Sequence, residues 1–101
     1  MNTAPASLAP LRRGAIVMAL YQQYPLRTTE ATVARSVAPF LEGPSDLDKD
    51  LAYLLASDLV TRQQEPFPNG VILKTYGLTV KGVNLAEGTA TDPGVVIHRG
   101  S

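Results

Sequence analysis

Acidic side chains carry most of the chemistry that this chain of 101 residues could perform, and they are concentrated in one segment. Asp46, Asp48 and Asp50 alternate there with other residues. Alternating aspartates also begin a calcium loop, but neither the glycine turn nor the distal glutamate of such a loop follows at the required spacing. Because negative charge is favourable near the start of a helix, we interpret the three aspartates as helix-stabilising groups.

Combinations of residues typical of catalysis or metal binding are scarce. His98 is the only histidine, and the chain has no cysteine. A histidine-based metal site or a Ser-His-Asp triad would therefore depend on one side chain near the C-terminus. No glycine-rich phosphate loop is present either. We therefore expect a protein that is not an enzyme and that uses no cofactor or metal ion.

Several polar side chains are suited to contacts with duplex DNA. A DNA-reading helix places its N-terminal residues against base edges, and flanking groups hold phosphates. Ser45, Lys49 and Tyr53 belong to the acidic segment and would approach the bases. The side chains expected to hold the DNA backbone are Arg27, Thr28, Thr29, Arg62, Asn69 and Lys74.

Charge argues against this interpretation. The segment from Glu42 to Asp58 has five acids and one base, a net charge of −4, which would repel a polyanion. Nine basic and nine acidic residues give the whole chain no net charge, whereas DNA-binding domains are usually basic. The alternative is a protein-interaction module whose acidic helix binds a basic partner or imitates the charge of DNA. Tyr53 and Phe67 would then be contact points for that partner or for a second copy in a homodimer.

Two amphipathic helices are expected in the first half of the chain. The first spans Leu11 to Tyr24 and is ended by a proline. The second is capped by Thr28 or Thr29 and ends near Ser36, because Pro39 follows. The side chains expected on their buried faces are Leu11, Ala15, Ile16, Met18, Ala19, Leu20, Tyr24, Ala31, Val33, Ala34, Val37, Phe40 and Leu41.

A third helix is expected to begin at Ser45, with Asp48 completing a capping box. Its apolar stripe consists of Leu47, Leu51, Leu54, Leu55 and Leu59. The polar residues expected on the opposite face are Asp46, Lys49, Asp50, Tyr53 and Ser57.

A β-hairpin and a short helix complete the predicted elements. The strands are Val60–Glu65 and Val71–Tyr76, and the loop between them contains an Asn-Gly pair that favours a tight turn. The last helix is capped by Thr79 and ended by Gly88. This order of elements is typical of a winged helix-turn-helix domain, a mainly helical α+β fold with a small hairpin. We place the domain at residues 11–88, after a flexible arm at 1–10 and before an extended tail at 89–101.

Five short motifs give the chain a resemblance to a known group. They are Leu11-Arg12-Arg13-Gly14-Ala15-Ile16-Val17, Asp50-Leu51-Ala52-Tyr53-Leu54, Leu59-Val60-Thr61, Leu78-Thr79-Val80-Lys81-Gly82 and Glu87-Gly88-Thr89-Ala90-Thr91-Asp92-Pro93-Gly94-Val95. With these motifs the chain resembles the small winged helix-turn-helix proteins, about 100 residues long, of Mu-like bacteriophages and prophages. The resemblance implies a DNA-binding transcriptional regulator and supplies no catalytic residues.

The remaining expectations concern location. The N-terminal segment lacks the basic start and apolar run of a secretory signal, and no apolar run is long enough to span a membrane. The lack of cysteine is compatible with a reducing compartment. We therefore expect the cytoplasm of a bacterial host, with no membrane partner.

Overall fold

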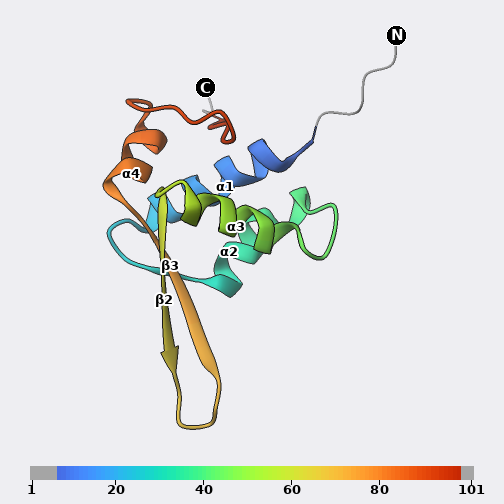
Figure 1. The fold of residues 1–101 in the computed structure, drawn as a ribbon, viewed down its shortest axis with the longest axis vertical. Coiled ribbons are helices and arrows are strands. Elements are labelled where there is room, and N and C mark those ends of the chain that lie inside the picture. Colours follow the sequence, from blue (N-terminus) through green and yellow to red (C-terminus); the bar gives the residue numbers. More distant parts are fainter. Residues whose placement is uncertain (1–6, 99–101) are drawn as a thin grey trace.

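The protein has an α+β fold. The computed structural model describes residues 7–98, and this part contains four α-helices and a three-stranded antiparallel sheet. In chain order the elements are α1 (Ala9–Gln23), β1 (Thr28–Thr29), α2 (Glu30–Val37), the 3₁₀ helix η1 (Ala38–Phe40), α3 (Asp46–Ala56), β2 (Val60–Pro66), β3 (Ile72–Leu78) and α4 (Val80–Glu87). The helices gather at one end of the molecule and the β2–β3 hairpin projects from them (Figure 1). This arrangement is compatible with a winged helix.

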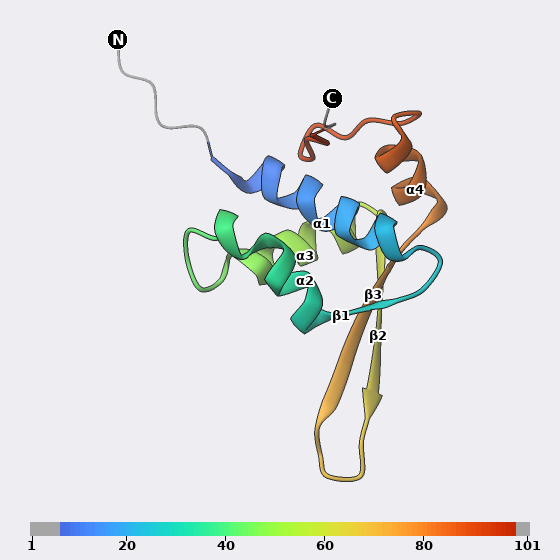
Figure 2. The same cartoon turned by 180° about the vertical axis from the view of Figure 1, so that it is seen from behind.

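Strand β3 is the centre of the sheet. It pairs with β2 along the whole hairpin, from Val60 opposite Leu78 to Pro66 opposite Ile72. On its other side it pairs with β1, which lies at the base of the hairpin (Figure 2). The sequence analysis missed β1, because two residues are too few to show the alternation that marks a strand.

Two of the predicted helix caps are confirmed. The Thr29 hydroxyl accepts a hydrogen bond from the Thr32 amide at the start of α2, and the Thr79 hydroxyl accepts one from the Gly82 amide in α4. Helix α4 ends at Gly88, whose φ is +88°.

The predicted capping box of α3 is wrong. Ser45 makes no side-chain capping bond at the start of this helix. The Asp46 carboxylate instead accepts from the amides of Glu42 and Gly43, each at 2.7 Å. Since Asp46 turns back into the preceding loop, it ties that loop to the helix.

Helix α1 differs from expectation at its start, whereas helix α2 ends within one residue of its predicted end. Helix α1 begins at Ala9, so Pro10 belongs to the helix and not to a flexible arm; a proline is tolerated there because the first amides of a helix have no partner within it. Residues 1–6 of that predicted arm lie outside the described residues. Helix α2 ends at Val37, and Pro39 lies in η1.

The core lies between α1, α2, α3, α4 and the base of the sheet. Its buried side chains are Ile16, Val17, Leu20, Val33, Val37, Leu51, Leu54, Leu59, Val60, Tyr76, Leu85, Ala86 and Val95. The leucine stripe of α3 is largely confirmed, since Leu47 and Leu55 pack partly buried against this core. The predicted faces of α1 and α2 are wrong at five positions that are exposed in the structure: Leu11, Tyr24, Ala31, Phe40 and Leu41.

The segment after α4 is folded onto the domain and does not form an extended tail. Val95 is buried in the core, and the Val96 amide donates to the Pro10 carbonyl oxygen at 3.0 Å. Residues 99–101 of the predicted tail lie outside the described residues. No helix in the described part of the chain is both long and apolar enough to cross a membrane.

Candidate nucleic-acid interface

A groove of about 620 Å³ separates α3 from the β2–β3 hairpin. Helix α3 lines one side with Asp48, Leu51, Ala52, Leu55 and Ala56. The other side is formed by Arg62, Lys74 and Tyr76 of the hairpin together with Glu30 at the start of α2. The groove therefore places two cationic side chains beside the helix that the sequence analysis expects to read DNA.

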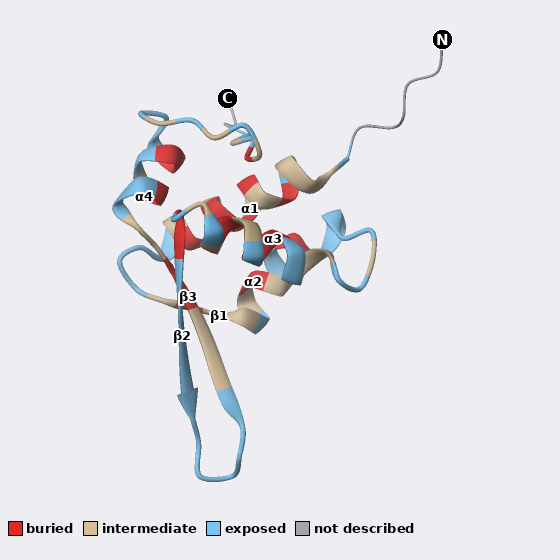
Figure 3. Ribbon diagram, in the orientation of Figure 1, coloured by how far each residue is buried: buried red, intermediate tan, exposed pale blue. Residues whose placement is uncertain are grey.

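The strand register places Arg62 and Lys74 on one face of the hairpin. Arg62 lies opposite Tyr76, and Gln64 lies opposite Lys74, two residues further along each strand. Since side chains two residues apart in a strand point to the same side, Arg62 and Lys74 share the face whose base is buried against the helices. Residues 61–70 of the hairpin are all exposed (Figure 3).

The outward side of α3 carries small and polar residues. Ser45, Lys49, Ala52 and Ala56 follow one another at helical spacing, and all four are exposed. Ala52 and Ala56 also line the groove. Ser45 and Lys49 therefore occupy positions that a surface partner can reach, as the DNA hypothesis requires.

Asp50 lies on the inward side of α3, where the sequence analysis expected exposure. Its side chain is 1% exposed and accepts hydrogen bonds from the guanidinium groups of both Arg12 and Arg13 on α1. Its position in the sequence carries a signal, because Asp50 is three residues after Leu47 and four before Leu54 and so falls inside the apolar stripe. The carboxylate is a structural link between α1 and α3.

Arg12 extends this ion-pair network to the loop before α3. Its guanidinium lies 3.5 Å from carboxylate oxygens of both Glu42 and Asp46, and it donates to the Phe40 carbonyl oxygen at 3.1 Å. The hydrogen bond to Asp50 is the main cause that raises the pKa of Arg12. The pKa of Asp46 is lowered, chiefly by the Glu42 amide that donates to it. Three of the five acids between Glu42 and Asp58 therefore face arginines of α1.

Tyr53 is partly buried and makes contacts within the fold. Its hydroxyl donates to the Asp92 carboxylate, and this bond is the main cause that raises the pKa of Tyr53. The guanidinium carbon of Arg13 lies 4.1 Å from the centre of the tyrosine ring, within the range of a cation–π contact. Tyr53 thus fastens the segment after α4 to α3, so both its hydroxyl and its ring already have partners within the fold.

Three predicted phosphate contacts before α2 are likewise structural. Arg27 donates to the Thr61 and Thr75 hydroxyl and carbonyl oxygens at 3.0–3.1 Å, which joins the two long strands. The Thr28 side chain is buried, and its hydroxyl has no hydrogen-bond partner. Thr29 caps α2. These residues hold the sheet and α2 together.

Burial changes the proton affinity of one groove residue. Tyr76 is 1% exposed, and its hydroxyl donates to the Glu30 carboxylate at 2.8 Å. Burial first, and then the hydrogen bond to Glu30, raise the pKa of Tyr76 to about 12. Tyr76 therefore stays neutral, and its hydroxyl remains hydrogen-bonded to Glu30, one of the acids that line the groove.

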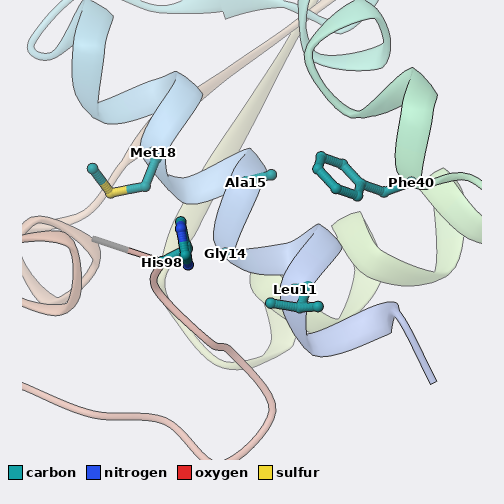
Figure 4. Close-up of a pocket in the computed structure, with 6 residues that line it drawn as sticks. All are labelled: Leu11, Gly14, Ala15, Met18, Phe40 and His98. Carbon is teal, nitrogen blue, oxygen red and sulfur yellow. The ribbon is translucent and has the colours of Figure 1, made fainter. Parts of the chain in front are cut away.

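A second depression, which is apolar, lies along α1. It has a volume of about 470 Å³ and is lined by Leu11, Gly14, Ala15, Met18, Phe40 and His98 (Figure 4). Of these lining residues only His98 has a polar side chain, so the depression lacks the pair of groups that acid–base or nucleophilic catalysis requires. Among residues 7–98, no three histidine, aspartate or glutamate side chains are grouped so that they could hold a metal ion.

Comparison with known proteins gives no information on this site. No family model, no curated protein and no solved structure matches this chain.

Proposed function

We propose that this protein is a non-enzymatic winged helix-turn-helix protein that binds duplex DNA. In this proposal α3 enters the major groove and the β2–β3 hairpin lies along the adjacent backbone. The order of elements and the position of the hairpin beside α3 support the assignment, because DNA-binding domains of this class present one helix to the major groove.

The observation that carries the proposal is the separation of charges by the fold. Asp50 and Asp46 face Arg12 on the inner side of α3, so two of the acids that argued against DNA are paired there, and Asp48 is the acid that remains in the groove. The outer side keeps Lys49, and Arg62 and Lys74 flank it across the groove. Cations placed along one surface can bind phosphates even when the chain has no net charge.

Each residue of this surface has a distinct expected role. Lys49 would donate to a guanine edge or to a phosphate, and Ser45 would donate to a phosphate. Arg62 and Lys74, both on the hairpin side of the protein groove, would hold the DNA backbone there. Asn69, at the exposed tip of the hairpin, would add a polar contact there, although its side-chain oxygen accepts from the Val71 amide.

The alternative is binding of a basic protein by α3. It needs exposed acids, and the exposed side of α3 offers Asp48 beside Lys49. The DNA hypothesis is therefore the better supported of the two. A role as a phage or prophage transcriptional regulator is a further proposal that rests on the resemblance described above. Action as a homodimer is a separate proposal.

Fluorescence anisotropy with a labelled random-sequence duplex at low salt tests the proposal. We expect binding at micromolar protein, weaker binding by Lys49→Ala, and tighter binding by Asp48→Asn because a repulsive charge is removed. Both substitutions are on the surface, so neither should change stability by more than about 0.5 kcal/mol. Absence of binding by the unchanged protein would refute the DNA function. Equal affinities of all three proteins would exclude α3 as the contact surface.

A further inference from the structure

The β2–β3 hairpin is an arm with an unusual tip. Each strand has seven residues, so at about 3.3 Å per residue the arm is roughly 23 Å long. Beyond its base it leaves the body of the protein and is exposed over most of its surface (Figure 3). The side chains at its end therefore cannot contribute to the core.

These end residues are apolar in spite of their exposure. No residue from Pro66 to Ile72 is charged. Phe67 is 44% exposed, Val71 is 52% exposed and Ile72 is 55% exposed. Large apolar side chains at the end of a projecting arm are not buried in the protein alone. Such exposed apolar clusters are typical of contact surfaces.

The tip is also stiff. Prolines on both sides of Phe67 fix the backbone φ angles at those positions. The Phe67 amide donates to the Val71 carbonyl oxygen at 2.7 Å, and the Gly70 amide donates to the Phe67 carbonyl oxygen at 3.0 Å. Gly70 adopts a φ of +85°, which closes the turn. The aromatic ring is thus presented on a preorganised loop and would lose little conformational freedom on binding.

Charge on the arm changes from cationic to neutral toward the tip. Arg62 and Lys74 lie on one face of the shaft, as described above. Glu65 is the acid nearest the tip, and its register opposite Leu73 places it on the other face. The same alternation ends the face of Arg62 and Lys74 at Ile72, whereas Phe67 follows Glu65 beyond the end of β2. The uncharged apolar tip therefore lies directly beyond the cationic part of the arm.

We propose that Phe67 is a wedge that inserts from the minor groove between two stacked base pairs and kinks the duplex. This inference rests on the proposed DNA-binding function and extends it to the shape of the bound DNA. Apolar side chains in minor-groove proteins unstack base steps in this way, and the kink lets the DNA contact more of the protein. Arg62 and Lys74 would hold the phosphates of the strand that passes along the shaft.

The test uses the whole protein and a duplex that reports both bending and unstacking. The duplex carries a donor and an acceptor dye at its ends and 2-aminopurine at a central pyrimidine–purine step. We expect the protein to bring the ends closer and to raise the 2-aminopurine fluorescence. Phe67→Ala should abolish both signals and weaken binding roughly tenfold, the order expected for the loss of one base–aromatic contact. Phe67→Leu should keep part of both signals, because leucine also serves as a wedge.

Matched controls separate this inference from the proposed function. Leu26→Ala removes a still more exposed apolar side chain outside the hairpin and should leave bending unchanged. If the unchanged protein binds with a normal salt dependence but neither bends nor unstacks the duplex, the wedge is wrong and DNA binding stands. If it binds no duplex, both proposals are wrong.

Discussion

At the scale of single residues, Asp50 shows how the fold changes the meaning of a charge. As one of several acids in a helix it counts against DNA binding, yet in the folded chain it is enclosed by α3, Arg12 and Arg13. The leucine spacing on both sides of it indicates a buried position, but the partner arginines lie 37 and 38 residues earlier in the chain. Local periodicity carries no information on contacts so distant in sequence, so this network could not be predicted from the sequence.

Replacing Asp50 with alanine should strongly destabilise the protein. Arg12 is 3% exposed and would keep a buried positive charge without its closest counter-charge. Loss of one partner of a buried ion pair costs about 3–5 kcal/mol, so urea denaturation of Asp50→Ala should show a loss of that size. The matched control is Asp48→Ala on the exposed side of the same helix, with an expected change below about 0.5 kcal/mol. Similar losses for both variants would contradict the structural role of Asp50.

Tyr76 should make stability depend on pH in the alkaline range. Its pKa is about 12 in the folded protein against 10.0 ordinarily, so the folded chain holds this proton more tightly than the unfolded chain. The stabilising contribution is therefore complete below pH 10 and is lost as the pH rises toward about 12. Urea denaturation across this window should show a steeper loss of stability for the unchanged protein than for Tyr76→Phe. Equal slopes would contradict the raised pKa, and Tyr24→Phe, which removes an exposed tyrosine, is the control.

At the scale of elements, the sequence predicts helices α3 and α4 and the hairpin closely. Each has a strong local signal: a leucine stripe, a threonine cap with a closing glycine, or an Asn-Gly turn. The buried face of α1 was harder to predict, because apolar residues occur nearly all around it from Leu11 to Leu20. Which side is buried depends on how α1 packs against α3 and the C-terminal segment. As a result Leu11 is exposed and lines the open apolar depression, and Met18 lines the same depression while it packs partly buried against the core.

Gly14 is the place where α1 meets the C-terminal segment most closely. A Cβ atom built on Gly14 would lie 1.7 Å from the Val96 carbonyl oxygen, so a side chain there must displace that segment. Helix propensity alone predicts that Gly14→Ala stabilises α1 by about 1 kcal/mol. We expect the opposite sign, a destabilisation of roughly 1–3 kcal/mol, with faster hydrogen exchange at the Val96 amide. Gly43→Ala, whose Cβ would meet only ordinary contacts, is the control, and a stabilised Gly14→Ala variant would refute the close packing.

At the scale of the whole molecule, a net charge of zero conceals an uneven distribution. The inner ion pairs join α1, α3 and the loop between η1 and α3, and the cations beside the groove lie on the side of the hairpin. A count of charges along the chain cannot separate these two groups, since the separation arises only when α1 packs on α3. Of the nine predicted contact residues, the fold uses Arg27, Thr28, Thr29 and Tyr53 internally. The other five remain candidates for the DNA surface: Ser45, Lys49, Arg62, Asn69 and Lys74.

The salt dependence of duplex affinity tests this account most directly. Each phosphate contact contributes about 0.9 to the slope of log affinity against log salt, so Arg62→Ala combined with Lys74→Ala should flatten the slope by about 1 to 2. Lys81→Ala removes an exposed cation from α4, and this variant should show the same slope as the unchanged protein. A flattened slope in the double variant alone is the predicted result. An unchanged slope in that variant would contradict the claim that Arg62 and Lys74 belong to a DNA-binding surface.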